Sequence, residues 1–199
     1  MSTSAGGRSA KTALRAELLE GRRRRPAGHG ADGIAGVALD WPPVSRAATV
    51  AAYVSVGREP GTGPLLDALR ARGTRVLLPV LQPDGDLDWA AYDGTDDLVP
   101  AGRGLLEPAG ARLGLEALRQ ADVVLVPGLA VSAAGDRLGR GGGSYDRALA
   151  RVPAGTPVAV VLHDDEVGLA VPVEAHDRRV THALTPSGVV ALGAGSGTA

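Results

Sequence analysis

Five short apolar runs, separated by segments of helical or turn character, constrain how this chain can fold. The runs are Thr49–Val54, Arg75–Val80, Val123–Val126, Val158–Leu162 and Val180–Leu184. Runs of this length without alternation are typical of strands buried on both faces of a parallel sheet. They predict an α/β fold, a three-layer sandwich with a mainly parallel central sheet flanked by helices.

The segments between these runs predict the flanking elements. Pro64–Arg72 reads as a helix with proline in its first turn and Gly73 just after its end. Further helices are expected at Lys11–Glu20, near Ile34–Leu39 and at Ala111–Gln120, and an alternating strand at Leu87–Tyr92. In the first of these helices the apolar stripe consists of Ala13, Leu14, Leu18 and Leu19.

The length of 199 residues fits one domain with a sizeable core. We expect this domain at residues 10–190, a disordered tail at 1–9 and a flexible C-terminal tail at 191–199. A small excursion is expected at 82–110. The charge run Arg22–Arg25 is expected to be a solvated helix end.

Composition excludes several classes of protein. The chain has no cysteine, so disulfides, thiolate metal sites and thiol catalysis are excluded. The net charge of −1 provides no field that would recruit nucleic acid or an anionic membrane. No secretory segment and no run of roughly 18 apolar residues is present. We therefore expect a cytoplasmic protein, a monomer or weak homodimer, that binds neither nucleic acid nor membrane.

The most informative motif is the glycine-rich stretch Gly135–Asp146, which follows the apolar run Val123–Pro127 and precedes a helix-like segment. It holds five glycines and two arginines, Arg137 and Arg140, which we expect to be exposed. Glycine lets backbone N–H groups approach an anion closely, and arginine adds bidentate phosphate recognition. The stretch is neither a Walker A loop nor a dinucleotide-binding fingerprint. It nevertheless predicts a phosphate site.

Carboxylates near this loop have two interpretations each. Asp146 is either a first-turn acid favoured by the helix dipole or a magnesium ligand, and Tyr145 beside it could simply be a packed aromatic. Glu59 is either an inert, exposed loop residue or a hydrogen-bond acceptor for a ligand. The acidic run Asp164–Glu166 is either a solvated turn or a second source of carboxylates. Because ligands bind at the carboxyl ends of parallel strands, the loops after Val54, Val126 and Leu162 are expected to face one crevice.

Several of these motifs together resemble the 5-formyltetrahydrofolate cyclo-ligase (5,10-methenyltetrahydrofolate synthetase) family. The central loop carries the most specific match, and the resemblance spans about residues 11–186. The matching segments are Lys11 with Arg15, Tyr53–Thr62, Val76–Pro79, Glu107–Pro108, Leu125–Ala130, Gly135–Arg147 and Val171–Asp177.

The resemblance implies a ligase of one-carbon metabolism that uses ATP and Mg²⁺ to cyclise 5-formyltetrahydrofolate, a reduced folate. It implies that the nucleotide is bound by Lys11, Arg15, Arg137, Leu138, Gly139, Arg140, Gly141, Gly142, Gly143, Ser144 and Tyr145. Arg140 and Tyr145 would be catalytic and, with Glu59, would contact the folate. Asp146 and Asp177 would hold the metal.

The chain departs from the family pattern at Val131, Ser144 and Glu166, where the family usually has phenylalanine, tyrosine and glutamine. These departures leave open a second reading, a non-catalytic folate- or nucleotide-binding regulatory homologue. A third reading is a sugar-phosphate isomerase or acyl-CoA transferase on a similar fold.

Overall fold

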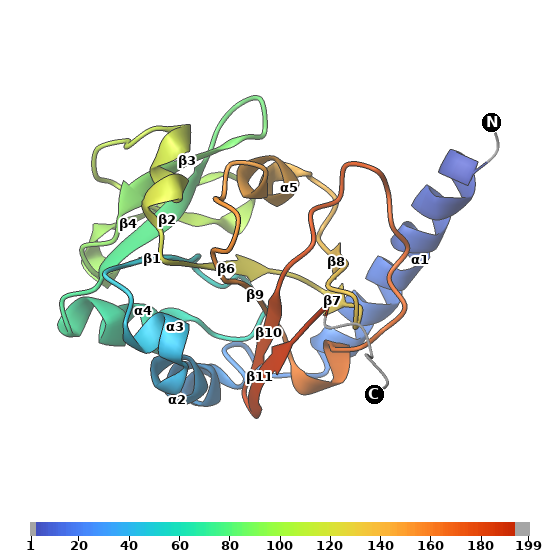
Figure 1. Ribbon diagram of the computed structural model, residues 1–199, viewed down its shortest axis with the longest axis horizontal. Coiled ribbons are helices and arrows are strands. Elements are labelled where there is room, and N and C mark those ends of the chain that lie inside the picture. Colours follow the sequence, from blue (N-terminus) through green and yellow to red (C-terminus); the bar gives the residue numbers. More distant parts are fainter. Residues whose placement is uncertain (1–2, 194–199) are drawn as a thin grey trace.

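The computed structural model describes residues 3–193, and its centre is a seven-stranded sheet (Figure 1). In spatial order the strands are β11 (Gly188–Ala191), β10 (His182–Thr185), β9 (Val158–Val161), β6 (Val123–Pro127), β1 (Thr49–Ala51), β2 (Arg75–Leu81) and β3 (Leu87–Ala91). All neighbours from β10 to β2 pair in parallel, and the two edge strands pair antiparallel. The predicted α/β class and mainly parallel sheet are confirmed.

Helices cover both faces of this sheet (Figure 1). One face carries α2 (Ala31–Asp40), α3 (Pro42–Ser45) and α4 (Gly63–Ala71), and the other carries α5 (Ser144–Leu149) and the 3₁₀ segment η3 (Leu115–Gln120). The remaining elements are the 3₁₀ segments η1 (Thr95–Asp97), η2 (Gly102–Gly104) and η4 (Asp164–Glu166), and the hairpins β4 (Leu98–Pro100) with β5 (Leu106–Pro108) and β7 (Ala130–Val131) with β8 (Arg137–Leu138). A helix was expected from Ala111, but Gly114, with φ of 88°, precedes a shorter 3₁₀ segment.

The core consists of two apolar layers divided by the sheet. Along β6, Val123 and Leu125 belong to the layer under α2 and α4, whereas Val124 and Val126 belong to the layer under η3 and α5. All four are essentially inaccessible to solvent. Because successive side chains of a strand point to opposite faces, an uninterrupted apolar run is what a strand between two layers requires.

The N-terminal helix α1 (Thr3–Arg23) lies outside these layers. Leu14, Leu18 and Leu19 from the predicted stripe pack against a small cluster around the β7–β8 hairpin. The helix begins at Thr3, so residues 3–9 are helical where a disordered tail was expected. At the other end, residues 194–199 of the expected C-terminal tail lie outside the described residues. Among residues 3–193, no helix combines the length and apolar character needed to cross a membrane.

The charge run at the end of α1 is the expected solvated helix end only in part, because Arg23 and Arg24 are exposed whereas Arg22 is buried. Arg22 is only 1% exposed and forms two hydrogen bonds with the carboxylate of Glu166, at 2.8 and 2.7 Å. A third bond, from Nη2 to the carbonyl of Gly128, measures 2.7 Å. Arg22 therefore fastens the C-terminal end of α1 to two loops that follow strands of the sheet.

The strand order creates a crevice between β1 and β6. After β1 the chain continues to β2 on one side, and it later returns as β6 on the other side of β1. The connections at the carboxyl ends of β1 and β6 therefore diverge, and ligands of open α/β sheets bind at such a point. This topology indicates where a site is expected before any side chain is considered.

Candidate active site

A cavity of ≈ 880 Å³ lies at this divergence point. Its wall includes Tyr53 and Val54 after β1, and Pro127 and Gly128 after β6. Every residue that the sequence predicted for the site also lines it: Lys11, Arg15, Glu59, Arg137, Leu138, Gly139, Arg140, Gly141, Gly142, Gly143, Ser144, Tyr145, Asp146 and Asp177. Segments more than 160 residues apart in the sequence thus meet at one site, since Lys11 bonds Asp177.

The glycine-rich loop connects β8 to α5 and forms one side of the cavity. Gly141 and Gly143 have φ of 102° and 71°, a backbone region that favours glycine. A Cβ built on Gly139 would lie 2.8 Å from Nη1 of Arg137, so the loop also packs closely against that guanidinium. Glycine is required here both by backbone conformation and by close approach.

Arg137 and Arg140 occupy different environments, although both were expected to be exposed. Arg137 is 5% exposed and donates to the carbonyl of Pro127 and to Oδ1 of Asp146, at 3.1 Å each. The expectation is wrong for Arg137, because its position in the β7–β8 hairpin directs it inward. It holds for Arg140, whose side chain is 53% exposed.

Glu59 is not the exposed loop residue that one interpretation proposed. It is 6% exposed, and its two oxygens accept hydrogen bonds from the Val56 amide at 2.9 Å and from Nε of Arg140 at 3.1 Å. A buried carboxylate on the cavity wall, held in place by two donors, retains acceptor capacity for a ligand. The structure therefore favours the ligand-contacting interpretation.

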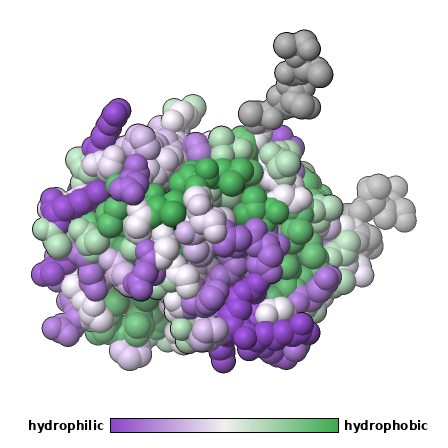
Figure 2. All heavy atoms as spheres, turned by 90° about the horizontal axis from the view of Figure 1, so that it is seen from below, coloured by the Kyte–Doolittle hydropathy of each residue, from purple (hydrophilic) through white to green (hydrophobic). Residues whose placement is uncertain are grey.

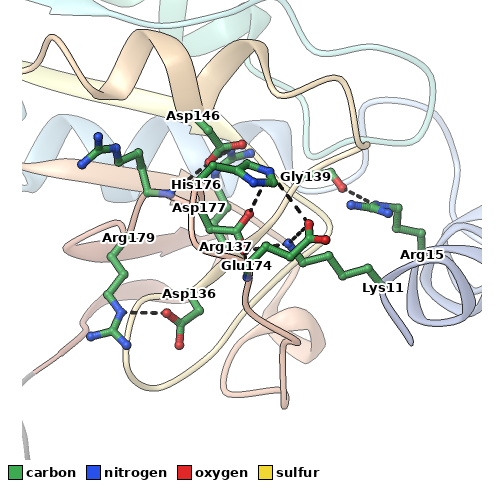
Figure 3. A network of polar contacts seen from close by, with 11 residues as sticks. Lys11, Arg15, Asp136, Arg137, Gly139, Asp146, Glu174, His176, Asp177 and Arg179 are labelled. Atoms are coloured by element: carbon green, nitrogen blue, oxygen red, sulfur yellow. Dashed lines mark hydrogen bonds and ion pairs between the residues drawn. The ribbon is translucent and has the colours of Figure 1, made fainter. Parts of the chain in front are cut away.

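Two cations of α1 reach the cavity from the side opposite the sheet (Figure 3). Nζ of Lys11 lies 2.6 Å from Oδ2 of Asp177 and 2.9 Å from Oε2 of Glu174, and Nε of Arg15 donates to the carbonyl of Gly139 at 2.8 Å. Burial alone would lower the pKa of Lys11, but the hydrogen bonds to both carboxylates outweigh it and raise that pKa. Lys11 is therefore a permanent cation of the site.

The two carboxylates expected to hold metal make different contacts: Asp177 pairs with Lys11, and Asp146 pairs with Arg137. For Asp177, burial raises the pKa, but the hydrogen bonds from Lys11 and from the Glu174 amide, together with nearby positive charge, outweigh it and lower the pKa. Ligand atoms of Glu174, His176 and Asp177 lie within 4.8 Å of one another. Asp146 is outside that group, and its Oδ1 accepts from Arg137 and from the Arg178 amide, each at 3.1 Å.

Tyr145 lies beside Arg137, whose guanidinium carbon is 5.8 Å from the ring centroid. Burial, followed by the negative charge of Glu59, raises the pKa of the Tyr145 phenol far above its ordinary range. The hydroxyl therefore keeps its proton and can donate a hydrogen bond, but it is not suited to act as a general base.

One suggested source of carboxylates does not line the cavity, and sequence reasoning missed other residues that do. In the acidic run Asp164–Glu166, Asp164 and Asp165 are exposed, as the solvated-turn interpretation expects, and Glu166 is buried against Arg22. The residues missed include Tyr53, Leu105, Leu106, Glu107, Arg147, Glu174, His176 and Arg178. Glu174 and His176 stand within three residues of Asp177, and Glu107 belongs to the matching segment Glu107–Pro108 in β5, so these signals could have identified them, whereas Leu105 and Leu106 gave none.

The departures from the family pattern are distributed unevenly. Val131 is buried in β7 and Glu166 is buried against Arg22, and neither lines the cavity. Of the three, Ser144 alone contributes to the cavity wall. Most of the departure therefore concerns packing.

Comparisons with known proteins agree with this geometry. The model of the 5-formyltetrahydrofolate cyclo-ligase family matches residues 8–186. The chain is 45% identical over 191 residues to a 5-formyltetrahydrofolate cyclo-ligase of Mycolicibacterium smegmatis, covering 92% of this chain and 97% of that protein. It is 36% identical over 154 residues to the Escherichia coli K12 protein of the same name, covering 76% and 85%.

Solved structures show the same relationship. The structure of the Aquifex aeolicus 5,10-methenyltetrahydrofolate synthetase superposes with a TM-score of 0.78 at 25% identity, covering 95% of this chain and 96% of that one. The match to the family model includes most of α1 and the late Glu174–Asp177 segment, and both contribute to the cavity wall. Sequence, fold and cavity thus lead to one conclusion: the chain belongs to the 5-formyltetrahydrofolate cyclo-ligase family.

Proposed function

We propose that this protein catalyses the ATP- and Mg²⁺-dependent cyclisation of 5-formyltetrahydrofolate to 5,10-methenyltetrahydrofolate, with release of ADP and phosphate. One observation carries the proposal: a glycine-rich loop with three arginines around it shares a single cavity with a buried glutamate and a carboxylate cluster. Phosphoryl transfer needs positioning and charge neutralisation more than covalent chemistry from the protein. The cavity provides groups for both.

The phosphate end of the cavity is formed by the loop and α1. Arg140 has an exposed guanidinium, of which Nε contacts Glu59, so its terminal nitrogens can reach a phosphoryl group. Arg15 and the amides of Gly139–Gly143 lie on the same wall. We assign nucleotide binding to these groups, with Lys11, Arg137, Leu138, Ser144 and Tyr145 completing the predicted set.

The apolar part of the cavity lining suits a partly apolar, planar substrate. It includes Val54, Val56, Pro79, Leu81, Leu87, Leu105 and Leu106. Glu59 lies between this wall and Arg140, so it can accept hydrogen bonds from a bound heterocycle while it orients the arginine. We assign folate contacts to Glu59, Arg140 and Tyr145.

The proposed reaction uses this arrangement in two steps. The formyl oxygen of the substrate attacks the γ-phosphorus of ATP, and Arg140 stabilises the charge that develops on the phosphoryl oxygens. N10 then attacks the activated formyl carbon, the ring closes, and the oxygen leaves with phosphate. The Tyr145 hydroxyl, which keeps its proton, orients the folate by donating a hydrogen bond.

The donor set also fits Mg²⁺. The ion prefers few carboxylates when phosphates complete its coordination, and Asp146 and Asp177 are hard oxygen donors on the cavity wall. Each accepts hydrogen bonds from the described residues through one oxygen, Oδ1 in Asp146 and Oδ2 in Asp177, which leaves the other available. When bound, the ion would neutralise phosphate charge and hold the γ-phosphoryl group in place.

The test is an assay of the purified protein with MgATP and 5-formyltetrahydrofolate, followed by methenyl absorbance. We expect turnover that requires both ATP and Mg²⁺. Arg140→Ala should lower kcat/KM by about 10³-fold or more, as loss of a transition-state cation does. The matched control is Arg119→Ala, which removes an exposed arginine that pairs with Glu116 away from the cavity.

The regulatory alternative predicts ligand binding without turnover. Its main motivation was the departure at three positions, of which only Ser144 lines the cavity. Absence of turnover in a preparation that binds ADP by calorimetry would favour this alternative and refute the proposed activity.

A further inference from the structure

The hydroxyl of Tyr53 is a buried polar group on the cavity wall for which the mechanism above has no role. The residue follows β1 and is 4% exposed. Its Oη has no hydrogen-bond partner among residues 3–193. A buried hydroxyl without a partner is costly, and such groups are usually satisfied by protein, water or a ligand.

The surroundings of Tyr53 indicate a ligand. Tyr53 lines the same cavity as Glu59 and Tyr145, and its phenol interacts electrostatically with both, as it also does with the buried pair of Arg22 and Glu166. Burial, with Glu59 next, raises the pKa of the Tyr53 phenol well above its ordinary value of 10.0. The hydroxyl therefore remains protonated and can serve as a hydrogen-bond donor.

The two other tyrosines show that this pattern is specific to Tyr53. Tyr92 is also buried, but its hydroxyl donates to Oδ1 of Asp67 at 2.6 Å and it lies outside the cavity wall. Tyr145 lines the cavity but is only partly buried. Tyr53 alone among the three combines full burial, a place on the wall and an unused hydroxyl.

We propose that Tyr53 is a substrate-positioning residue whose hydroxyl donates a hydrogen bond to an acceptor atom on the pteridine ring of the folate. The inference rests on the proposed function, because the folate supplies the acceptor. Tyr53 and Glu59 then form a donor and an acceptor on one wall. A heterocycle that carries both ring acceptors and N–H donors matches this pair, whereas anionic phosphates need cations such as Lys11, Arg15 and Arg140.

The test compares Tyr53→Phe with the matched control Tyr92→Phe. For Tyr53→Phe we expect KM for 5-formyltetrahydrofolate to rise about threefold to tenfold, the loss of one net hydrogen bond, with KM for ATP unchanged. Its unfolding midpoint without ligand should equal or exceed that of the parent, because the removed hydroxyl makes no hydrogen bond with the described residues. Tyr92→Phe should show the reverse, a lower midpoint and an unchanged folate KM.

Direct binding separates this inference from the proposed activity. The dissociation constant of 5-formyltetrahydrofolate, measured by calorimetry without ATP, should rise by the same factor in Tyr53→Phe. A parent protein that binds folate without turnover would refute the proposed activity but not the positioning role. A folate KM and dissociation constant within twofold of the parent, or a parent that does not bind folate, would overturn the inference.

Discussion

Replacing Glu166 with glutamine tests the buried pair that fastens α1. Glu166 is 2% exposed, and its Oε1 and Oε2 accept hydrogen bonds from Nε and Nη2 of Arg22. Oε2 also accepts from the His163 amide at 3.0 Å. Glutamine preserves the shape but removes the charge, and its NH₂ group would face an N–H donor in either orientation of the amide.

The magnitude follows from this burial. Removing one partner of a buried ion pair costs about 3–5 kcal/mol, because the remaining charge is uncompensated. For a domain of this size each kcal/mol lowers the unfolding midpoint by about 2–4 °C, so we expect a decrease of roughly 6–20 °C for Glu166→Gln. The matched control is Glu20→Gln, which disrupts an exposed pair with Arg23 on the same helix and should cost less than about 1 kcal/mol.

Urea denaturation and calorimetry measure both variants. If Glu166→Gln loses no more stability than Glu20→Gln, the pair contributes little and the reasoning is refuted. A double variant, Arg22→Met with Glu166→Gln, provides a further check. It removes both charges, so it should be more stable than Glu166→Gln alone, since no unpaired guanidinium remains buried.

Two further predictions concern the loop and the pH dependence of stability. Gly139→Ala would place a methyl group 2.8 Å from Nη1 of Arg137 and should lower kcat/KM at least tenfold. The control is Gly142→Ala, which has no comparably close neighbour and should lower kcat/KM less. Equal losses of kcat/KM in the two variants would contradict this prediction. The hydrogen bond from Arg151 lowers the pKa of Asp86 below its ordinary value of 3.8. The contribution of this pair to the free energy of unfolding is therefore present above that pH and is lost as the pH falls through the lowered pKa. Asp86→Asn should therefore flatten the loss of stability below about pH 4 in urea titrations, and an unchanged acid limb would contradict the assignment.

The sheet could be predicted because its signals are local. Uninterrupted apolar runs such as Val123–Val126 identify strands that two layers bury, and proline and glycine at the ends of Pro64–Arg72 identify a helix. The edge strand β11 was missed because its four residues, Gly188–Ala191, are only partly buried and too few to show a period. The hairpins β4–β5 and β7–β8 were missed for the same reason, since they contain strands of two or three residues.

The members of the site were predicted better than their environments. The glycine-rich loop with its arginines identified the cavity, because residue type alone indicates phosphate chemistry. Burial of Arg137 was missed because β8, the strand that directs it inward, has only two residues and gives no periodic signal. Burial of Arg22 and Glu59 was missed because each has a partner far away in sequence, Glu166 for Arg22 at a separation of 144 residues and Arg140 for Glu59 at a separation of 81. A run of arginines is equally consistent with a solvated surface until that partner is known.

The N-terminal helix α1 is attached at its end and at its middle by different kinds of contact. Its C-terminal end is held by a buried ion pair, whereas its middle is held by three leucines and by the contacts of Lys11 and Arg15 with cavity groups. In the surface view of Figure 2, strongly polar and apolar residues lie side by side on the face shown. Lys11 is buried, so salt screens its pairs with Glu174 and Asp177 only weakly, whereas the side chain of Arg140 is 53% exposed in its pair with Glu59. Raising the ionic strength should therefore weaken the contact of the glycine-rich loop with Glu59 before it loosens α1, which makes Arg140 the salt-sensitive contact of the cavity.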